Sequence, residues 1–446
     1  MPLPFFARRL LARTGLARFS AEAKRLTGGD TRFVRYLSDR TLAAPVDALL
    51  DPTTFPDAAG PDVMHLNLPA PRFDSPVGGW RFTADRTGNP PAWGLPALRE
   101  QVADQFRLRH DVTLDPAEQV FVTHGATAAY AAVLDAFVNP GDRVVLFDPS
   151  SPLFALGAAS RRAKVRWVPT WTDDGRTRYL FDTLAAAMKG AMLVVLADPA
   201  NPAGGVLSGD DLEHLAWLAN RHDVLVFVDE SFGRFRYESA ETTLAKQPGM
   251  SNRLLTAGSV TQGYGLGSLR VGWLSGHRQL VRACAANALL SAPFVPTACQ
   301  QAAVRAVQAQ DDLFAPVLDE FRGKRQYTID RLRGMGLDPT WPGGGFTTWV
   351  PVGPLGIDGR TFAERLLREH RVLVGPGCAF GPSGTDFVRV SFAVEDGRLR
   401  EGLSRLARFV SELKGQPVVE ETRVAVPEVS ETPAPGDPPA AVEERL

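Results

Sequence analysis

The feature that most constrains this chain is a regular alternation of short apolar runs with helical stretches. Helical spacing of apolar residues begins near Ala126 and again over residues 210–220, between runs that have the length of buried strands. Strands that alternate with helices predict a mostly parallel α/β sheet sandwiched by helices. The expected strands are residues 120–123, 143–148, 164–169, 192–198, 223–230 and 254–258.

The remainder of the 446 residues divides by pattern. From about residue 300 to 414 the helices are longer, and residues 343–352 and 387–393 resemble strands, which predicts a smaller C-terminal α+β domain. We therefore expect a large domain over 61–299 and a small domain over 300–414. Residues 1–60 are expected to form an arm that joins the small domain or a dimer partner. The Pro- and Glu-rich residues 415–446 are expected to form a disordered tail.

Composition excludes several classes of protein. A net charge of −1 gives no reason to expect nucleic acid as a partner. The three cysteines have no CxxC spacing, so we expect no metal site and a reducing, cytoplasmic setting. No apolar run reaches the length of a membrane span, about 18 residues. The first 25 residues are basic and amphipathic, and arginines interrupt them, which does not fit a secretory signal. A transit peptide or membrane-surface helix stays an alternative to the packed arm.

Candidate chemistry lies where the strands end, as is usual in open α/β sheets. Gly125 follows a strand and opens a helix, a place where backbone N–H groups bind phosphate. Ser259, Thr261 and Arg270 combine hydroxyls with a guanidinium, which is a good phosphate clamp. Asp229 ends the most apolar strand, where it is either a cap or the partner of a buried cation. Read singly, each of these residues also fits a structural role in a turn or cap.

Taken together, eight ordered motifs resemble the class I/II aminotransferases, which are pyridoxal-phosphate (PLP) enzymes of fold type I. The resemblance covers residues 60–410. The motifs are LNLPAPRFDSP (66–76), NPPAWGLPALR (89–99), NPGDRVVLFDPSSPLF (139–154), DPANPAGG (198–205), DESF (229–232), SVTQGYGLGSLRVG (259–272), PGCAFG (376–381) and VRVS (388–391). Membership implies a seven-stranded, mostly parallel sheet in a large domain, a smaller α+β domain and a homodimer.

The resemblance also implies a role for each matching residue. Asp229 would pair with the pyridine nitrogen of PLP, and Asn201 would bind the ring oxygen. Arg389 would hold the carboxylate of an amino acid or 2-oxo acid. The phosphate would be held by Ala126, Thr127, Ser259, Thr261 and Arg270.

Four positions depart from the family pattern in this same site. The Schiff-base lysine is replaced by Gln262, whose amide nitrogen is not nucleophilic because its lone pair is delocalised. Phe232 replaces a tyrosine, Ser151 replaces the ring-stacking aromatic, and Asn89 replaces a tyrosine that reaches a phosphate in related dimers. None of the six lysines follows a strand that bears other site residues, and His124 is the one candidate for an alternative base.

Three hypotheses therefore stay open. The chain is an enzyme that binds PLP or pyridoxamine phosphate (PMP) without a covalent link, and ordinary lysine-dependent transamination is then not expected. Alternatively it is a non-catalytic binding or scaffold protein, a pseudoenzyme on the aminotransferase fold. A mutated aminotransferase is the third reading, and the other three departures argue against it. The identity of the substrate is not readable from the sequence.

Overall fold

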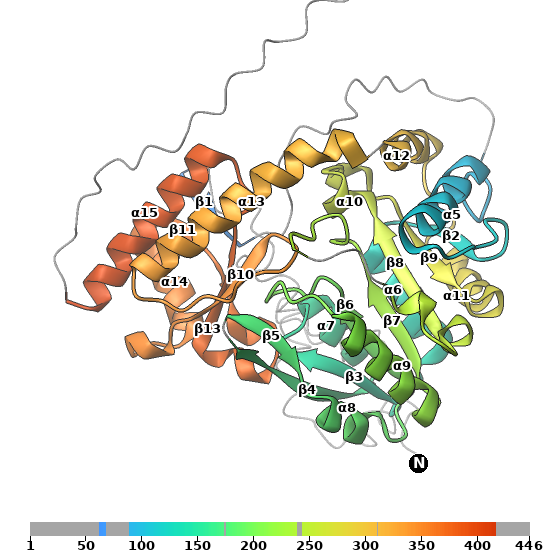
Figure 1. The fold of residues 1–446 in the computed structure, drawn as a ribbon, viewed down its shortest axis with the longest axis horizontal. Coiled ribbons are helices and arrows are strands. Elements are labelled where there is room, and N and C mark those ends of the chain that lie inside the picture. The colour runs from blue at the N-terminus through green and yellow to red at the C-terminus, as the bar shows by residue number, and fades with distance from the viewer. Residues whose placement is uncertain (1–61, 68–88, 174, 239–242, 310, 416–446) are drawn as a thin grey trace, which may run out of the picture.

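The central layer of the protein is an eight-stranded sheet. The computed structural model describes residues 62–67, 89–173, 175–238, 243–309 and 311–415. The strands lie in the order β2-β9-β8-β7-β6-β3-β4-β5 (Figure 1). Their bounds are β2 (Val120–Thr123), β3 (Arg143–Asp148), β4 (Lys164–Asp173), β5 (Arg176–Tyr179), β6 (Leu193–Ala197), β7 (Leu225–Asp229), β8 (Leu254–Ser259) and β9 (Gly272–Gly276).

The middle of this sheet is parallel. Strands β4, β3, β6, β7 and β8 pair in parallel, whereas β9 is antiparallel to both β2 and β8. The predicted mostly parallel α/β fold is confirmed. One strand more than the expected seven is present, because β4 extends to Asp173 and β5 folds back on it as an antiparallel edge strand.

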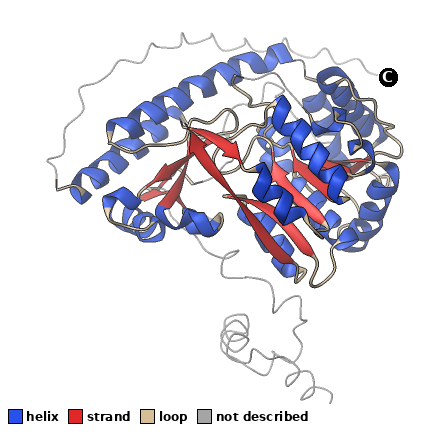
Figure 2. Ribbon diagram, turned by 60° about the horizontal axis from the view of Figure 1, so that its bottom comes forward, coloured by secondary structure: helices blue, strands red, loops and turns tan. Residues whose placement is uncertain are grey.

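Helices cover both faces of the sheet, as Figure 2 shows. Successive strand residues point to opposite faces, so Phe227 of β7 packs in one apolar cluster and its neighbour Val228 in another. The Phe227 face carries α6 (Ala126–Phe137), α7 (Pro152–Ser160) and α11 (Arg278–Ser291). The Val228 face carries α8 (Phe181–Met188) and α9 (Gly209–His222). Farther along that face, α5 (Pro96–His110) packs on β2 and on α12 (Thr297–Gln308).

The C-terminal part contains α13 (Asp311–Gly334), α14 (Gly359–His370) and α15 (Asp396–Leu413) around two small sheets. One sheet has the order β10-β13-β12, and in the other β1 pairs in parallel with β11. The strands are β1 (Met64–His65), β10 (Thr347–Pro351), β11 (Val372–Leu373), β12 (Gly375–Pro376) and β13 (Phe387–Ser391). Residues 64–65 thus lie against the C-terminal part. The domain borders stay predictions, and the expected arm (1–60) and nearly all of the expected tail (415–446) lie outside the described residues.

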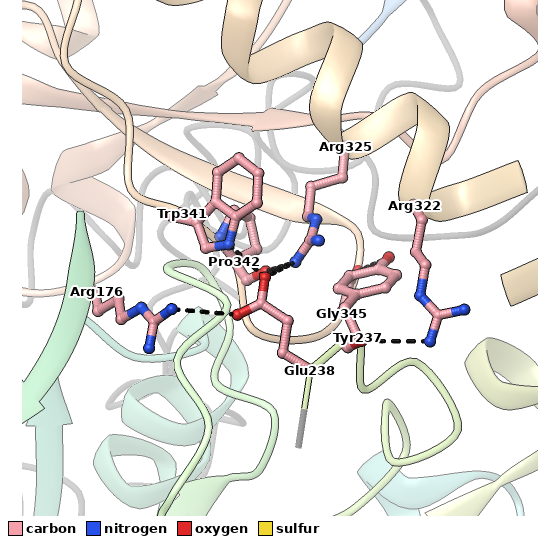
Figure 3. Close-up of polar contacts among 8 residues, drawn as sticks. All are labelled: Arg176, Tyr237, Glu238, Arg322, Arg325, Trp341, Pro342 and Gly345. Atoms are coloured by element: carbon pink, nitrogen blue, oxygen red, sulfur yellow. Dashed lines mark hydrogen bonds and ion pairs between the residues drawn. The ribbon is translucent and has the colours of Figure 1, made fainter. Parts of the chain in front are cut away.

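A polar cluster ties the segment after β7 to this C-terminal part (Figure 3). The Glu238 carboxylate accepts from Arg325 Nη1 (3.1 Å) and from Trp341 Nε1 (2.7 Å). It also accepts from Arg176 of β5 at 3.4 Å. The hydroxyl of the neighbouring Tyr237 donates to the Gly345 carbonyl at 2.6 Å. The segment that begins at Asp229 is therefore anchored at its far end to α13 and to the loop before β10.

Neither a membrane-spanning helix nor a metal-binding cluster is present among the described residues. No helix among them is long and apolar enough to cross a membrane. Within the same ranges, no group of three or more His, Cys, Asp or Glu side chains is placed to hold a metal ion.

Candidate active site

The carboxyl ends of neighbouring strands bring the candidate residues into one row. Across the antiparallel pairs, Thr123 of β2 lies opposite Gly272 of β9, and Gly272 lies opposite Ser259 of β8. Across the parallel pairs, Asp229 of β7 stands between Ala197 of β6 and Ala257 of β8. The turns after these strands, which carry the sequence motifs, therefore meet at one edge of the sheet.

An anion cradle forms where β2 turns into α6. Gly125 has a φ of +82° and caps the helix that Ala126 and Thr127 begin. Arg270 lies directly above this turn, because a Cβ added to Gly125 would stand 2.7 Å from Arg270 Nη2. Arg270 Nη1 donates to Thr261 Oγ1 at 3.3 Å. A helix N-terminus, a guanidinium and a hydroxyl thus converge, which is the arrangement that binds a phosphate group.

Gln262 lies in the short helix α10 (Val260–Gly263), half-buried, beside the end of β8. The hydroxyl of Ser259 donates to Gln262 Oε1 at 2.9 Å. The same hydroxyl lies 3.4 Å from Ser231 Oγ. The amide is therefore held by its oxygen, and it offers hydrogen bonds but neither a nucleophile nor a base.

Asp229 is a carboxylate without a cation. Its Oδ1 accepts the backbone N–H of Ser231 at 3.0 Å, and no Lys or Arg of the described residues forms an ion pair with it. Burial raises the pKa of Asp229 above its usual value, and the hydrogen bonds from Ser231 oppose this rise only in part. A bound cation would favour the ionised form of this carboxyl.

Arg389 is a buried cation that has no anionic partner among the described residues. It is 8% exposed, and no carboxylate among the described residues pairs with it. Arg389 Nη1 donates to Asn201 Oδ1 at 3.0 Å, Nη2 donates to the Asn67 carbonyl, and the ring of Phe380 lies 4.7 Å from the guanidinium carbon. Loss of solvation lowers the pKa of Arg389 to about 9. A carboxylate ligand would supply the charge that this buried guanidinium lacks.

The three other positions that depart from the family pattern differ in their burial. Phe232 follows the Asp229 turn, is buried, and packs edge-on against Phe346 with ring centres 5.3 Å apart. Ser151 is buried at the start of α7, whereas Asn89 is exposed. His124 stands half-buried beside the anion cradle.

No described lysine is placed in the site. Lys324 is buried, but its Nζ donates to the Val394 carbonyl at 2.9 Å and pairs with Glu320 and Asp396. Lys246 pairs with Asp111, and Lys414 donates to the Met335 carbonyl. Lys164 begins β4 at the opposite edge of the sheet, and Lys189 follows α8. Lys24 lies outside the described residues.

Two residues that contact the site residues were not predicted from the sequence. Ser231 bridges Asp229 and Ser259, and it lies within the DESF motif, so the motif itself was a signal. Asn67 reaches Arg389 through its backbone carbonyl. Every residue type has a backbone carbonyl, so no sequence pattern could predict this contact.

Comparison with known proteins points to one family of enzymes. The model of the family "Aminotransferase class I and II" matches residues 83–406. An arginine–pyruvate transaminase of Pseudomonas aeruginosa is 30% identical over 363 residues, which are 80% of this chain and 92% of that protein. An aspartate aminotransferase of Pyrococcus abyssi is 27% identical over 369 residues, which are 81% and 95% of the two chains.

Solved structures match along nearly their whole length. An aromatic aminotransferase from Pyrococcus horikoshii superposes with a TM-score of 0.73 at 27% identity, over 80% of this chain and 97% of that one. An aspartate aminotransferase from Thermus thermophilus with maleate gives 0.74 at 26% identity, over 83% and 99%. The chain therefore belongs to the class I and II aminotransferase family.

Proposed function

We propose that this protein binds PLP or PMP without a covalent link, together with an amino acid or a 2-oxo acid. We further propose that it does not run the ordinary lysine-dependent transamination. The observation that carries the proposal is a half-buried carboxylate, Asp229, and a buried guanidinium, Arg389, neither of which has a charged partner among the described residues, in a site that also contains an anion cradle. Members of the family use PLP as their cofactor.

The residues present fit this cofactor. The cradle at Gly125, Thr261 and Arg270 offers donors and positive charge to a phosphate group. Asp229 offers a carboxylate to a protonated ring nitrogen, which removes the cost of its burial. Asn201 receives the Arg389 donor on its Oδ1, so its Nδ2 is the atom offered to the ring oxygen.

When bound, the cofactor supplies an electron-withdrawing ring and a group that exchanges an amine. The chain supplies position and charge. Arg389 holds the substrate carboxylate through its guanidinium, while Arg270 and Thr261 fix the phosphate end. Gln262, held by Ser259, can only hydrogen-bond, so no lysine takes the α-proton at this position. His124 is the described residue beside the cradle whose imidazole offers a nitrogen that can accept a proton.

The remaining expectations belong to this proposal. We expect a cytoplasmic homodimer that acts on small amino or 2-oxo acids and not on nucleic acid. A non-catalytic binding or scaffold protein is the second candidate, and the loss of the lysine together with the changes at Phe232, Ser151 and Asn89 favours it.

The experiment that separates the two candidates is a titration of the purified full-length chain with PLP and with PMP. The proposal predicts a saturable change in the cofactor absorbance and one phosphate retained per chain after dialysis. The scaffold candidate predicts no change in absorbance and no retained phosphate. An Arg270→Gln variant serves as the control, because it removes the cradle and leaves Asp229 and Gln262 in place.

A further inference from the structure

A second cavity lies behind the candidate active site, on the opposite face of the sheet. Helix α5, which packs on the Val228 face of the sheet, forms one wall of this cavity, and the lining includes Glu230 but not Asp229. The cavity has a volume of about 80 Å³, and its lining includes Ser231, Gly258 and Ser259, so its wall is shared with the site. Its polar lining comes from α5 and from the turn after β7: Gln105, Arg109, His110, Glu230, Arg234 and Arg236.

Arg236 is the distinctive residue of this cavity. Its side chain is 6% exposed, and its Nη2 lies 2.5 Å from Asp198 Oδ2. Its Nε and Nη1 are buried and have no hydrogen-bond acceptor among the described residues. The other oxygen of Asp198 already accepts the backbone N–H of Leu207 at 3.1 Å. Buried donors without acceptors destabilise the folded protein, so the cavity favours a ligand that brings acceptors.

The charges around the cavity select the sign of that ligand. Among the described residues of the lining, three guanidinium groups stand against two carboxylates, counting Asp198. His110 Nδ1 is also buried without a hydrogen-bond partner among the described residues. Burial, together with the positive charges of Arg109, Arg236 and Lys246, lowers the pKa of His110 to about 4. A metal cation would meet repulsion here, and an apolar ligand would leave the donors unsatisfied.

We propose that this cavity binds a small oxyanion, a carboxylate or phosphate group, with Arg236 as its central donor. Its volume exceeds by several times the ~10–15 Å³ that one water molecule needs. Arg234 is held at the rim by the rings of Tyr264 and Phe314, at 4.6 and 4.0 Å. The site is distinct from the phosphate cradle at Arg270, which lies with α6 on the other face of the sheet.

The test is a thermal-unfolding titration of the full-length Arg270→Gln variant, in which the cradle no longer competes for phosphate. Inorganic phosphate and acetate are titrated separately against potassium chloride at equal ionic strength. The proposal predicts a saturable rise in Tm with at least one oxyanion beyond that with chloride. Tighter saturation by phosphate assigns the site to phosphate groups, and tighter saturation by acetate assigns it to carboxylates. No saturable rise with either would overturn the proposal.

Two variants assign the binding to this cavity. Arg236→Lys keeps a cation opposite Asp198 but removes the extra donors, and we expect at least tenfold weaker oxyanion binding. Arg161→Lys is its matched control, because Arg161 pairs with Asp135 at 2.8 Å away from the cavity and should leave binding unchanged.

If Arg236→Lys does not fold, a second pair of variants tests the same assignment. Gln105→Glu adds a negative charge to the lining, whereas Gln101→Glu adds the same charge to α5 outside it. Only Gln105→Glu should weaken binding. Wild-type affinity in Gln105→Glu, or equal losses in both glutamate variants, would contradict the assignment.

Discussion

The hydroxyl of Ser259 donates a hydrogen bond of 2.9 Å to Oε1 of Gln262, the residue that stands at the family's lysine position. This contact fixes the orientation of the Gln262 amide and leaves its NH₂ group as a hydrogen-bond donor. A lysine at the same place would be a cation and a nucleophile. The substitution therefore replaces a nucleophile with a group that can only make hydrogen bonds.

The glycine under Arg270 gives a prediction with a matched control. Gly125→Ala places a methyl group 2.7 Å from Arg270 Nη2 and should displace the guanidinium from the cradle. Gly141→Ala has a similar φ, +96°, but meets nothing within 4 Å. Both variants should lose about 1–3 kcal/mol of stability from backbone strain at positive φ. Only Gly125→Ala should lose affinity for PLP, at least tenfold in an absorbance titration. Equal PLP affinities in the two variants would argue against the cradle.

Asp229→Asn tests the carboxylate that faces the ring nitrogen. Hydrogen bonds to charged groups contribute about 1.5–3 kcal/mol, so we expect the Kd for PLP to rise roughly 10- to 100-fold. Asp229→Glu keeps the charge and should lose less. A Kd for Asp229→Asn within twofold of wild type would contradict the role of Asp229.

The same carboxyl predicts a dependence of stability on pH without cofactor. Burial raises the pKa of Asp229, so the folded chain holds this proton over a range in which the unfolded chain has released it. Stability then falls as the pH rises from the unfolded pKa through the raised pKa. Asp229→Asn should lack this component, so its free energy of unfolding should gain on wild type as the pH rises. Denaturant unfolding at several pH values measures this, and parallel pH profiles would count against it.

Arg389 gives a prediction about the substrate. Arg389→Met removes the buried guanidinium and should abolish measurable binding of a 2-oxo acid such as pyruvate to the PMP-loaded chain. Truncating one partner of a buried charge pair costs about 2–5 kcal/mol, which is roughly 30-fold or more in Kd. PMP itself should still bind. Arg389→Lys, which keeps the charge and loses the planar fork, should fall between the two. Unchanged pyruvate affinity in Arg389→Met would place the carboxylate elsewhere.

The sequence predicted the layers of the fold well because buried parallel strands are continuous apolar runs. Residues 143–148 were predicted and observed with the same bounds as β3. β9 was missed, because Gly272–Gly276 contains two glycines and a serine and follows the phosphate motif without a break. β5 was missed because its half-exposed RTRY sequence has no apolar face and depends on pairing with β4.

Residues of the candidate site were predictable only where they belong to a sequence motif. The neighbours of Asp229, Gln262 and Arg270 follow from motif spacing and strand order. The Asn67 carbonyl at Arg389 and the Arg236–Asp198 pair join residues far apart in the sequence, and these contacts depend on tertiary packing. No local pattern encodes them. The roles of the site residues stay predictions until a ligand is bound.

The most direct test of the central claim is the intact mass of the wild type and of Gln262→Lys after incubation with PLP and reduction with borohydride. Gln262→Met, which has a similar volume and no amine, is the control. We expect the wild type to bind PLP and to release all of it on denaturation, with no gain in mass. Gln262→Lys should gain the mass of one cofactor, and Gln262→Met should gain none. A covalent adduct on the wild type, or none on Gln262→Lys, would contradict a site that is complete except for its lysine.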